Sequence, residues 1–426
     1  MVLSAVLFAG LALSLFATDL PTASPSDVGM SAERLERLDA ALREFCETRR
    51  IPGAVVLILR DGQAVFHRAF GKLDLEAGTP MPRDAVFRIA SQTKAVTSVA
   101  VMTLIEDGRL LLTDPVSIYI PGFNDTKVAV PIDGNPGAGY TEKPVKRPIT
   151  IRDLLTHTAG ISYGTGPAAK AYAEAGVQGW FFADKDETIG DSIERLARLP
   201  IDAHPGERYI YGFSTDILGR VVEVVSGMSL ADYFRTRITE PLGMTDTHFF
   251  LPEENIGRLT PVYGLGKDGR TIERVEDPAA SPYVKGPRKC FSGGAGLLST
   301  ARDYALFLQM LLDGGRSGLT RILGPKTVEL MTSNHVGDLY AGGRQGFGLG
   351  FWVTEHVGRS GEVGSVGAFG WGGAYATTYW VDPAERLVAV FMTQMLPAGN
   401  ADFQPKFRNL VYQAIALSYA GPFANK

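Results

Sequence analysis

The sequence predicts an α+β protein, in which one mixed, mainly antiparallel sheet is formed by both ends of the chain and sandwiched between helices. Strand-like patterns occur near both ends, before residue 71 and after residue 346, and helical patterns flank them. Strand patterns are weak in between, where short helices alternate with Pro/Gly-rich loops. We therefore expect residues 26–120 and 288–426 to form a sheet domain. Residues 121–287 should form a mainly helical inserted domain, with a site in the cleft between the two.

The composition is that of an ordinary globular protein. The 426 residues are 45% hydrophobic and 21% charged. The formal net charge of −4 offers no basic surface for nucleic acid. Cys46 and Cys290 lie far apart in sequence, which excludes a disulfide framework and a cysteine-rich zinc site. The six histidines are scattered and no phosphate-binding glycine motif is present, so we expect no metal or organic cofactor.

An uncharged apolar run, residues 2–17, lies at the N-terminus. It is shorter than the ~20 residues that span a membrane. It resembles the apolar core of a secretory signal, although the first basic residue, Arg34, comes well after it. Residues 1–25 are therefore either a signal, which would place the protein in the periplasm or outside the cell, or an N-terminal extension of a cytoplasmic protein. No later segment is long and apolar enough to form a stable membrane span.

The sheet domain is expected to begin with a helix and a hairpin. Residues 31–49 carry apolar side chains at helical spacing, and Ser31 is suited to cap this helix. The apolar runs 54–59 and 64–70 flank the turn signal Asp61-Gly62 and therefore predict a β-hairpin.

The next helix is unusual because it is apolar almost all round. Residues 94–107 have this pattern, which predicts a buried helix that ends at Gly108. The remaining expected elements are two helices in the middle of the chain, three strands and a final helix, at residues 151–156, 216–226, 348–353, 375–381, 387–392 and 405–419.

The buried helix opens with the chain's single S-x-x-K pattern, in which Ser91 and Lys94 lie one helical turn apart. The positive end of the helix and burial both disfavour the charged form of Lys94. A neutral lysine can accept the proton of a serine and so activate it as a nucleophile. The alternative is an ordinary capping serine followed by a lysine that reaches towards solvent.

A second serine, Ser162, lies in the G-x-S-x-G pattern of residues 160–164. A nucleophile elbow of this kind needs a strand before it and a helix after it. Here a helical segment precedes the pattern and Thr165-Gly166-Pro167 follows it, so we interpret it as a turn. We interpret the nearby His157 as structural.

Several segments together resemble the serine β-lactamase/penicillin-binding-protein superfamily, and in particular the class C β-lactamase-like carboxylesterases called family VIII. The resemblance covers about residues 26–420 and is carried by residues 87–94, 112–115, 151–160, 209–219, 292–297 and 370–373. It implies a β-lactamase/transpeptidase-like fold and a Ser91 nucleophile that forms an acyl-enzyme.

The same resemblance implies roles for further residues. Tyr211 matches the tyrosine of the family's Y-x-N motif, so with Ser91 and Lys94 it would form the catalytic set and pass a proton to the leaving group. The backbone amides of Ser91 and Ala374 would form the oxyanion hole, with each donor supplying on the order of 3 kcal/mol. The residues implied to contact the substrate are Gln92, Phe213, Trp371, Gly372 and Gly373.

The chain departs from the family's peptidases and lactamases at two positions. Phe213 stands where they have an asparagine that binds the substrate's amide, and Trp371 stands where many have a lysine that attracts its carboxylate. Both departures remove polar contacts and add apolar surface suited to an uncharged ester. We therefore expect a carboxylic ester hydrolase that acts on small, short-chain esters. The alternatives are a β-lactamase or D,D-peptidase acting on cephalosporin-like amides, an acyltransferase, and a non-catalytic binding protein.

Overall fold

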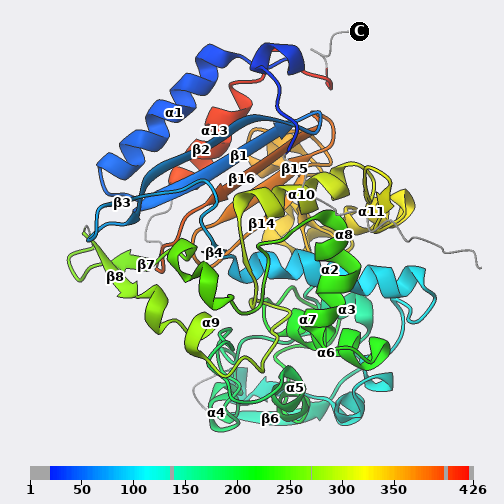
Figure 1. Ribbon diagram of the computed structural model, residues 1–426. Helices are drawn as coiled ribbons and strands as arrows, with labels where there is room; N and C mark the ends of the chain where they lie inside the picture. The colour runs from blue at the N-terminus through cyan, green and yellow to red at the C-terminus, as the bar shows by residue number, and fades with distance from the viewer. Residues whose placement is uncertain (1–19, 135–138, 270, 398–401, 422–426) are drawn as a thin grey trace, which may run out of the picture.

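The computed structural model describes residues 20–134, 139–269, 271–397 and 402–421 (Figure 1). The apolar run of residues 2–17 lies outside these ranges, so the choice between a signal and an extension stays open. Within the described ranges, no helix combines the length and the apolar character needed to cross a membrane.

One antiparallel sheet organises the described residues, in the strand order β12-β13-β14-β15-β16-β1-β2-β3. Its strands are β1 (Gly53–Arg60), β2 (Gln63–Asp74), β3 (Thr79–Pro80), β12 (Gly346–Phe347), β13 (Trp352–Val353), β14 (Phe369–Gly372), β15 (Thr378–Asp382) and β16 (Leu387–Met392). Near its centre, β1 pairs with β16, with Val55 opposite Met392. This pairing joins the two ends of the chain, as expected. All pairings between its strands are antiparallel, so the sheet is not mixed.

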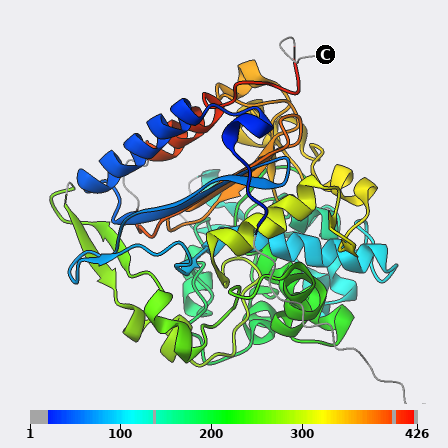
Figure 2. The ribbon, with the colours of Figure 1, turned by 45° about the horizontal axis from the view of Figure 1, so that its top comes forward.

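Helices cover both faces of the sheet (Figure 2). On one face, α1 (Ala32–Glu47) packs beside α13 (Phe403–Tyr412), and on the other α10 (Ala301–Leu312) packs against β1, β15 and β16. Strand β1 is buried throughout, and its alternate residues face the two layers. The expected helix–sheet sandwich is confirmed, as is the Ser31 cap, whose hydroxyl accepts a hydrogen bond from the Arg34 amide.

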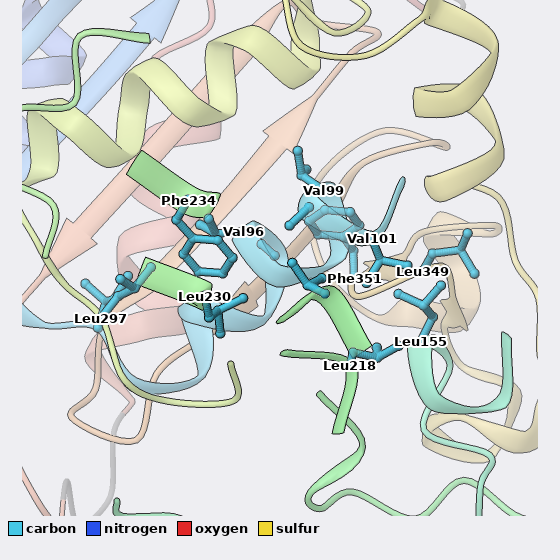
Figure 3. Close-up of a cluster of buried hydrophobic side chains, with 14 of the residues drawn as sticks. Val96, Val99, Val101, Leu155, Leu218, Leu230, Phe234, Leu297, Leu349 and Phe351 are labelled. Atoms are coloured by element: carbon cyan, nitrogen blue, oxygen red, sulfur yellow. The ribbon is translucent and has the colours of Figure 1, made fainter. Parts of the chain in front are cut away.

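The helix that carries the S-x-x-K segment lies inside the core. All residues of α2 (Thr93–Glu106) from Thr93 to Leu104 are buried, as its apolar pattern predicts. Gly108 follows the helix in the left-handed conformation, with φ of 68°. Figure 3 shows side chains of α2 packed among those of other segments, with labels on Val96, Val99, Val101, Leu155, Leu218, Leu230, Phe234, Leu297, Leu349 and Phe351. Its position is therefore fixed by packing on several sides.

The middle of the chain contributes most of the remaining helices. They are α3 (Ile151–Leu155), α4 (Ala169–Glu174), α5 (Ile189–Leu196), α6 (Ser214–Ser226), α7 (Leu230–Phe234), α8 (Glu240–Leu242) and α9 (Pro282–Lys285). Helix α6 packs against α2, α3, α5 and α7 and so links this region to the nucleophile's helix. Outside it lie α11 (Pro325–Met331) and α12 (Val357–Ser360).

In the part of the chain that the structure describes, four two-stranded pairings lie outside the main sheet. They are β4 (Phe87–Arg88) with β9 (Leu298–Ser299), β5 (Lys127–Pro131) with β6 (Tyr140–Pro144), β7 (Val262–Leu265) with β8 (Ile272–Glu276), and β10 (Arg316–Ser317) with β11 (Thr320–Arg321). Two of them, β5–β6 and β7–β8, lie in the segment expected to be mainly helical. Their short strands contain exposed charged residues, which weakens the sequence signal. The division into a sheet domain and an inserted domain stays a prediction.

Two C-terminal elements are shorter than their apolar patterns suggested. The expected strand 348–353 is reduced to β13, because the chain turns at Gly350, where φ is 104° and a Cβ atom would lie 2.4 Å from the Ser98 hydroxyl oxygen. The final helix ends at Tyr412, because the amides of Ala416 and Leu417 bond to the Gly29 carbonyl. Tertiary pairing replaces the local structure that the pattern favours.

Candidate active site

Ser91 lies in a tight turn between a strand and a helix. The turn, Ala90–Gln92, follows β4 and leads directly into α2. Ala90 is fully buried with φ of 42°, a conformation that costs a non-glycine residue on the order of 1–3 kcal/mol. The amide of Ile89 donates to the Leu297 carbonyl and holds the turn in place. Ser91 is therefore presented, half-buried, at the positive end of α2.

Lys94 lies beneath Ser91 and has three acceptors. Its side chain is 1% exposed, and Nζ lies 2.8 Å from the Gly294 carbonyl oxygen, 3.0 Å from the Tyr163 hydroxyl and 3.4 Å from Ser91 Oγ. Nζ also lies 4.7 Å from the centroid of the Tyr211 ring. Three acceptors match the three N–H groups of an ammonium ion.

The surroundings of Lys94 do not favour the loss of charge that the sequence suggested. Burial lowers the pKa of Lys94, but its interactions with Tyr163, Tyr211 and the Asp216 carboxylate outweigh burial and raise that pKa above its usual value. Burial and the helix end could be expected from the sequence, whereas the compensating groups come from distant segments. The fold thus favours the protonated form of Lys94.

Tyr163 is a site residue that was not expected from the sequence. The pattern at residues 160–164 is a turn, as expected, in which Ser162 Oγ accepts from the amides of Gly164 and Thr165. The next side chain, Tyr163, reaches Lys94 through its hydroxyl, and burial raises the pKa of Tyr163. The turn pattern contains no signal for this contact, because the two residues are 69 positions apart.

Tyr211 lies in the same site, but its hydrogen bond goes elsewhere. Trp371 Nε1 donates to the Tyr211 hydroxyl at 3.3 Å. Within the described residues, no hydrogen bond joins that hydroxyl to Ser91 or Lys94. The His157 ring packs 4.8 Å from the Tyr211 ring, and burial and Lys94 hold the pKa of His157 well below its usual range. His157 is thus a neutral packing group, and proton transfer through Tyr211 stays a prediction.

The end of β14 approaches Ser91 from the other side. Gly373 lies against the turn before α2, where a Cβ atom would be 2.5 Å from the Ile89 carbonyl oxygen. Only glycine permits this approach without displacing the turn. The amide of Gly373 donates to Thr377, whereas that of Ala374 has no backbone acceptor in the described part of the chain. This arrangement brings Ser91 and Ala374, the implied oxyanion donors, to one cavity.

That cavity has a volume of about 450 Å³ and opens onto Ser91. Its walls are mainly aromatic, and none of the residues that line it in the described structure is charged. They are Ser91, Tyr163, Trp180, Tyr211, Tyr340, Trp352, Trp371, Gly372, Gly373, Ala374, Thr377 and Gln404. Trp371, Gly372 and Gly373 thus lie where the resemblance implied.

Gln92 and Phe213 do not line this cavity in the described structure, so their contact with substrate stays a prediction. Gln92 is fully buried, and Phe213 is 1% exposed. Phe213 lies just before α6 and turns into the core, with its ring 4.9 Å from that of Tyr163 and 5.8 Å from that of Phe182. It therefore supports Tyr163 from behind instead of forming a wall of the cavity.

Several known proteins are similar to this chain in sequence and in fold. Residues 38–413 match the family model for beta-lactamase. The esterase EstB of Burkholderia gladioli is 31% identical over 89% of this chain and 94% of its own length, and protein Rv1367c of Mycobacterium tuberculosis is 34% identical over 90% and 100%. The structure of EstCE1, described as a hydrolase with promiscuous acyltransferase activity, is 29% identical, covers 89% of this chain and 98% of its own, and has a TM-score of 0.78.

These matches confirm the resemblance to family VIII esterases and the β-lactamase/transpeptidase-like fold. They also agree with the geometry, in which a serine and a buried lysine share the N-terminal turn of a core helix. The chain is a hydrolase of this fold, and it belongs to the beta-lactamase family.

Proposed function

We propose that this protein is a serine carboxylesterase that hydrolyses short-chain carboxylic esters through an acyl-enzyme on Ser91. The observation that carries the proposal is the contact between Ser91 Oγ and Lys94 Nζ at the floor of an uncharged, aromatic cavity. The likeness to EstB and EstCE1 supports the same chemistry.

Acylation begins with the proton of Ser91. Lys94 and Tyr163 are joined by a hydrogen bond and exchange protons as one unit, and the Tyr211 ring completes the cluster around Nζ. When the cluster has lost one proton, Nζ accepts the proton of Ser91, and Oγ attacks the ester carbonyl carbon. The carbonyl electron pair moves onto oxygen, where the amides of Ser91 and Ala374 stabilise the charge.

Collapse of this intermediate breaks the bond to the alcohol oxygen. The leaving alkoxide takes a proton from the cluster, with the Tyr211 hydroxyl, which faces the cavity, as the donor. Water then attacks the acyl-enzyme along the same path in reverse. Water gives its proton to the cluster as its oxygen bonds to the carbonyl carbon. The bond from that carbon to Ser91 Oγ then breaks, Oγ takes a proton back from the cluster, and the carboxylic acid is released.

The cavity favours esters over β-lactams or peptides that carry a carboxylate. A buried carboxylate needs a cationic partner to offset its desolvation. The cavity wall offers Trp371 instead, whose indole N–H is already bonded to Tyr211. An uncharged acyl or alcohol group meets no such cost and gains apolar contact with the aromatic rings.

The test is a substrate panel with two serine variants. The wild type should turn over p-nitrophenyl butyrate with a far higher kcat/KM than nitrocefin, and Ser91→Ala should abolish turnover. A fluorophosphonate should add to the peptide containing Ser91. Ser162→Ala should keep that adduct, because Ser162 Oγ accepts hydrogen bonds from the amides of its own turn and is not part of the proposed catalytic set. Full esterase activity in Ser91→Ala, or a preference for nitrocefin, would contradict the proposal.

A further inference from the structure

Asp216 is a buried carboxylate that the proposed reaction has not used. It lies in the first turn of α6 and is 1% exposed. Its Oδ1 accepts hydrogen bonds from Ser292 Oγ at 2.5 Å and from the Gly294 amide at 3.0 Å. The carbonyl of Gly294 in turn accepts from Lys94 Nζ at 2.8 Å. Gly294 therefore connects the carboxylate to the lysine.

The approach of Asp216 to this segment is tightly fixed. A Cβ atom on Gly294 would lie 2.3 Å from Asp216 Oδ2, so glycine is needed at that position. Ser292 Oγ also accepts from the Ala295 amide, and Thr97 Oγ1 of α2 donates to the Gly293 carbonyl. Residues 292–295 are thus held between α2 and α6, and the carboxylate determines where the lysine's acceptor lies.

The hydrogen-bond partners of Asp216 suit a carboxylate, although the site is buried. Burial raises the pKa of Asp216 above its usual value, and Lys94, Ser292 and the Gly294 amide offset part of that rise. Its hydrogen-bond partners are donors, which suit a carboxylate. The groups that face Lys94 are Tyr163, Tyr211, Asp216 and the neutral His157, and Cys290 also faces Asp216. Of these, only Asp216 brings a carboxylate.

We infer that Asp216 is the positioning residue for Lys94: it anchors the lysine's acceptor, balances its charge, and thereby sets the pH above which Ser91 becomes reactive. This inference rests on the proposed function, because it concerns the proton that leaves Ser91. It assigns a role in the reaction to α6, the helix that begins three residues after Tyr211.

The test measures the reactivity of Ser91 against pH in Asp216→Asn. Loss of one negative charge makes a proton less favourable on both Lys94 and Tyr163. The acid limb of the pH profile should therefore move to lower pH by about 1 unit. The plateau rate should fall roughly tenfold or more, because Gly294 is no longer held by a charge.

Two readouts separate this inference from the proposed function. The rate of fluorophosphonate addition to Ser91 reports the nucleophile without any assumption about substrate, and kcat/KM for p-nitrophenyl butyrate reports turnover. Failure of the wild type to label at any pH would contradict the proposed function. Normal labelling with an unmoved limb in Asp216→Asn would contradict the inference alone.

Matched variants distinguish charge from structure. Asp216→Glu keeps the negative charge, so the acid limb of its pH profile should stay at the wild-type pH even if its rate falls. If Asp216→Asn does not fold, the pH profile of Asp216→Glu still tests the inference. Ser292→Ala removes a hydrogen bond but keeps the carboxylate, so its limb should also stay. Asp303→Asn removes another buried carboxylate, one that bonds to Asp246 and Thr247, and should leave the profile unchanged. An equal shift in any of these variants would overturn the assignment.

Discussion

Replacing Tyr163 by phenylalanine tests whether the phenol bonded to Lys94 controls the nucleophile. The substitution removes the hydroxyl that lies 3.0 Å from Nζ and leaves the ring, which packs against Phe213. Lys94 then keeps two of its three acceptors, Gly294 and Ser91. One N–H of a buried ammonium ion is left without a partner.

The magnitude follows from that lost hydrogen bond. A hydrogen bond to a charged group contributes about 1.5–3 kcal/mol. At 1.36 kcal/mol for each pKa unit, its loss should lower the pKa of Lys94 by about 1–2 units relative to the wild type. The acid limb of the rate profile should move to lower pH by a similar amount. Loss of one member of the proton-transfer cluster should also lower kcat by about 10²-fold or more.

The assay is kcat and kcat/KM for p-nitrophenyl butyrate from pH 5 to pH 10, with Tyr211→Phe as the matched control. Because the Tyr211 hydroxyl bonds to Trp371 and not to Lys94, its removal should lower kcat with a smaller shift of the limb. A Tyr163→Phe enzyme with wild-type kcat and an unmoved limb would refute this reasoning. A larger shift of the limb in Tyr211→Phe than in Tyr163→Phe would refute it as well.

Three further substitutions probe the cavity and the packing behind it. Trp371→Lys introduces a cation beside the cavity. It should raise the ratio of kcat/KM for nitrocefin to kcat/KM for p-nitrophenyl butyrate at least tenfold, and an unchanged ratio would show that this side chain does not determine substrate preference. Phe213→Ala empties a core position beside Tyr163 and should lower the free energy of unfolding by about 3–5 kcal/mol, measured by urea denaturation, with a loss below 1 kcal/mol counting against its buried role. Gly373→Ala places a Cβ atom 2.5 Å from the Ile89 carbonyl oxygen. It should lower kcat about 10²-fold while circular dichroism shows a folded protein, and a fully active variant would show that the close contact between β14 and the turn of Ser91 is not needed.

The sequence predicted the local parts of the site well. Ser91 and Lys94 are joined by helical spacing, and the apolar pattern of residues 94–107 correctly predicted the buried helix that carries Lys94 and begins just after the turn of Ser91. Motif resemblance brought Tyr211, Trp371 and Gly373 to the same cavity. These signals depend on short segments that keep their own structure wherever the chain packs them.

The parts that failed depend on contacts between distant segments. The hydroxyl of Tyr163 and the carboxylate of Asp216 reach Lys94 only through the fold, and without them burial alone argued for a neutral lysine. Likewise, the motif position of Phe213 fixes its backbone but not the direction of its side chain. The structure turns that side chain into the core and not towards the cavity. Long-range charge and side-chain direction are therefore what the structure adds.

Trp371 and Asp216 together explain why the proposed esterase would discriminate against a charged substrate. The indole of Trp371 keeps a hydrogen-bond donor on the Tyr211 hydroxyl, as a lysine there could, but it brings no positive charge into the cavity. The buried cation beneath Ser91, Lys94, is balanced by Asp216 through Gly294. An incoming carboxylate would thus meet no uncompensated positive charge, whereas the neutral carbonyl of an ester needs only the two backbone amides. On this view Asp216→Asn, which unbalances Lys94, should improve nitrocefin binding relative to butyrate ester binding, even as it slows both reactions.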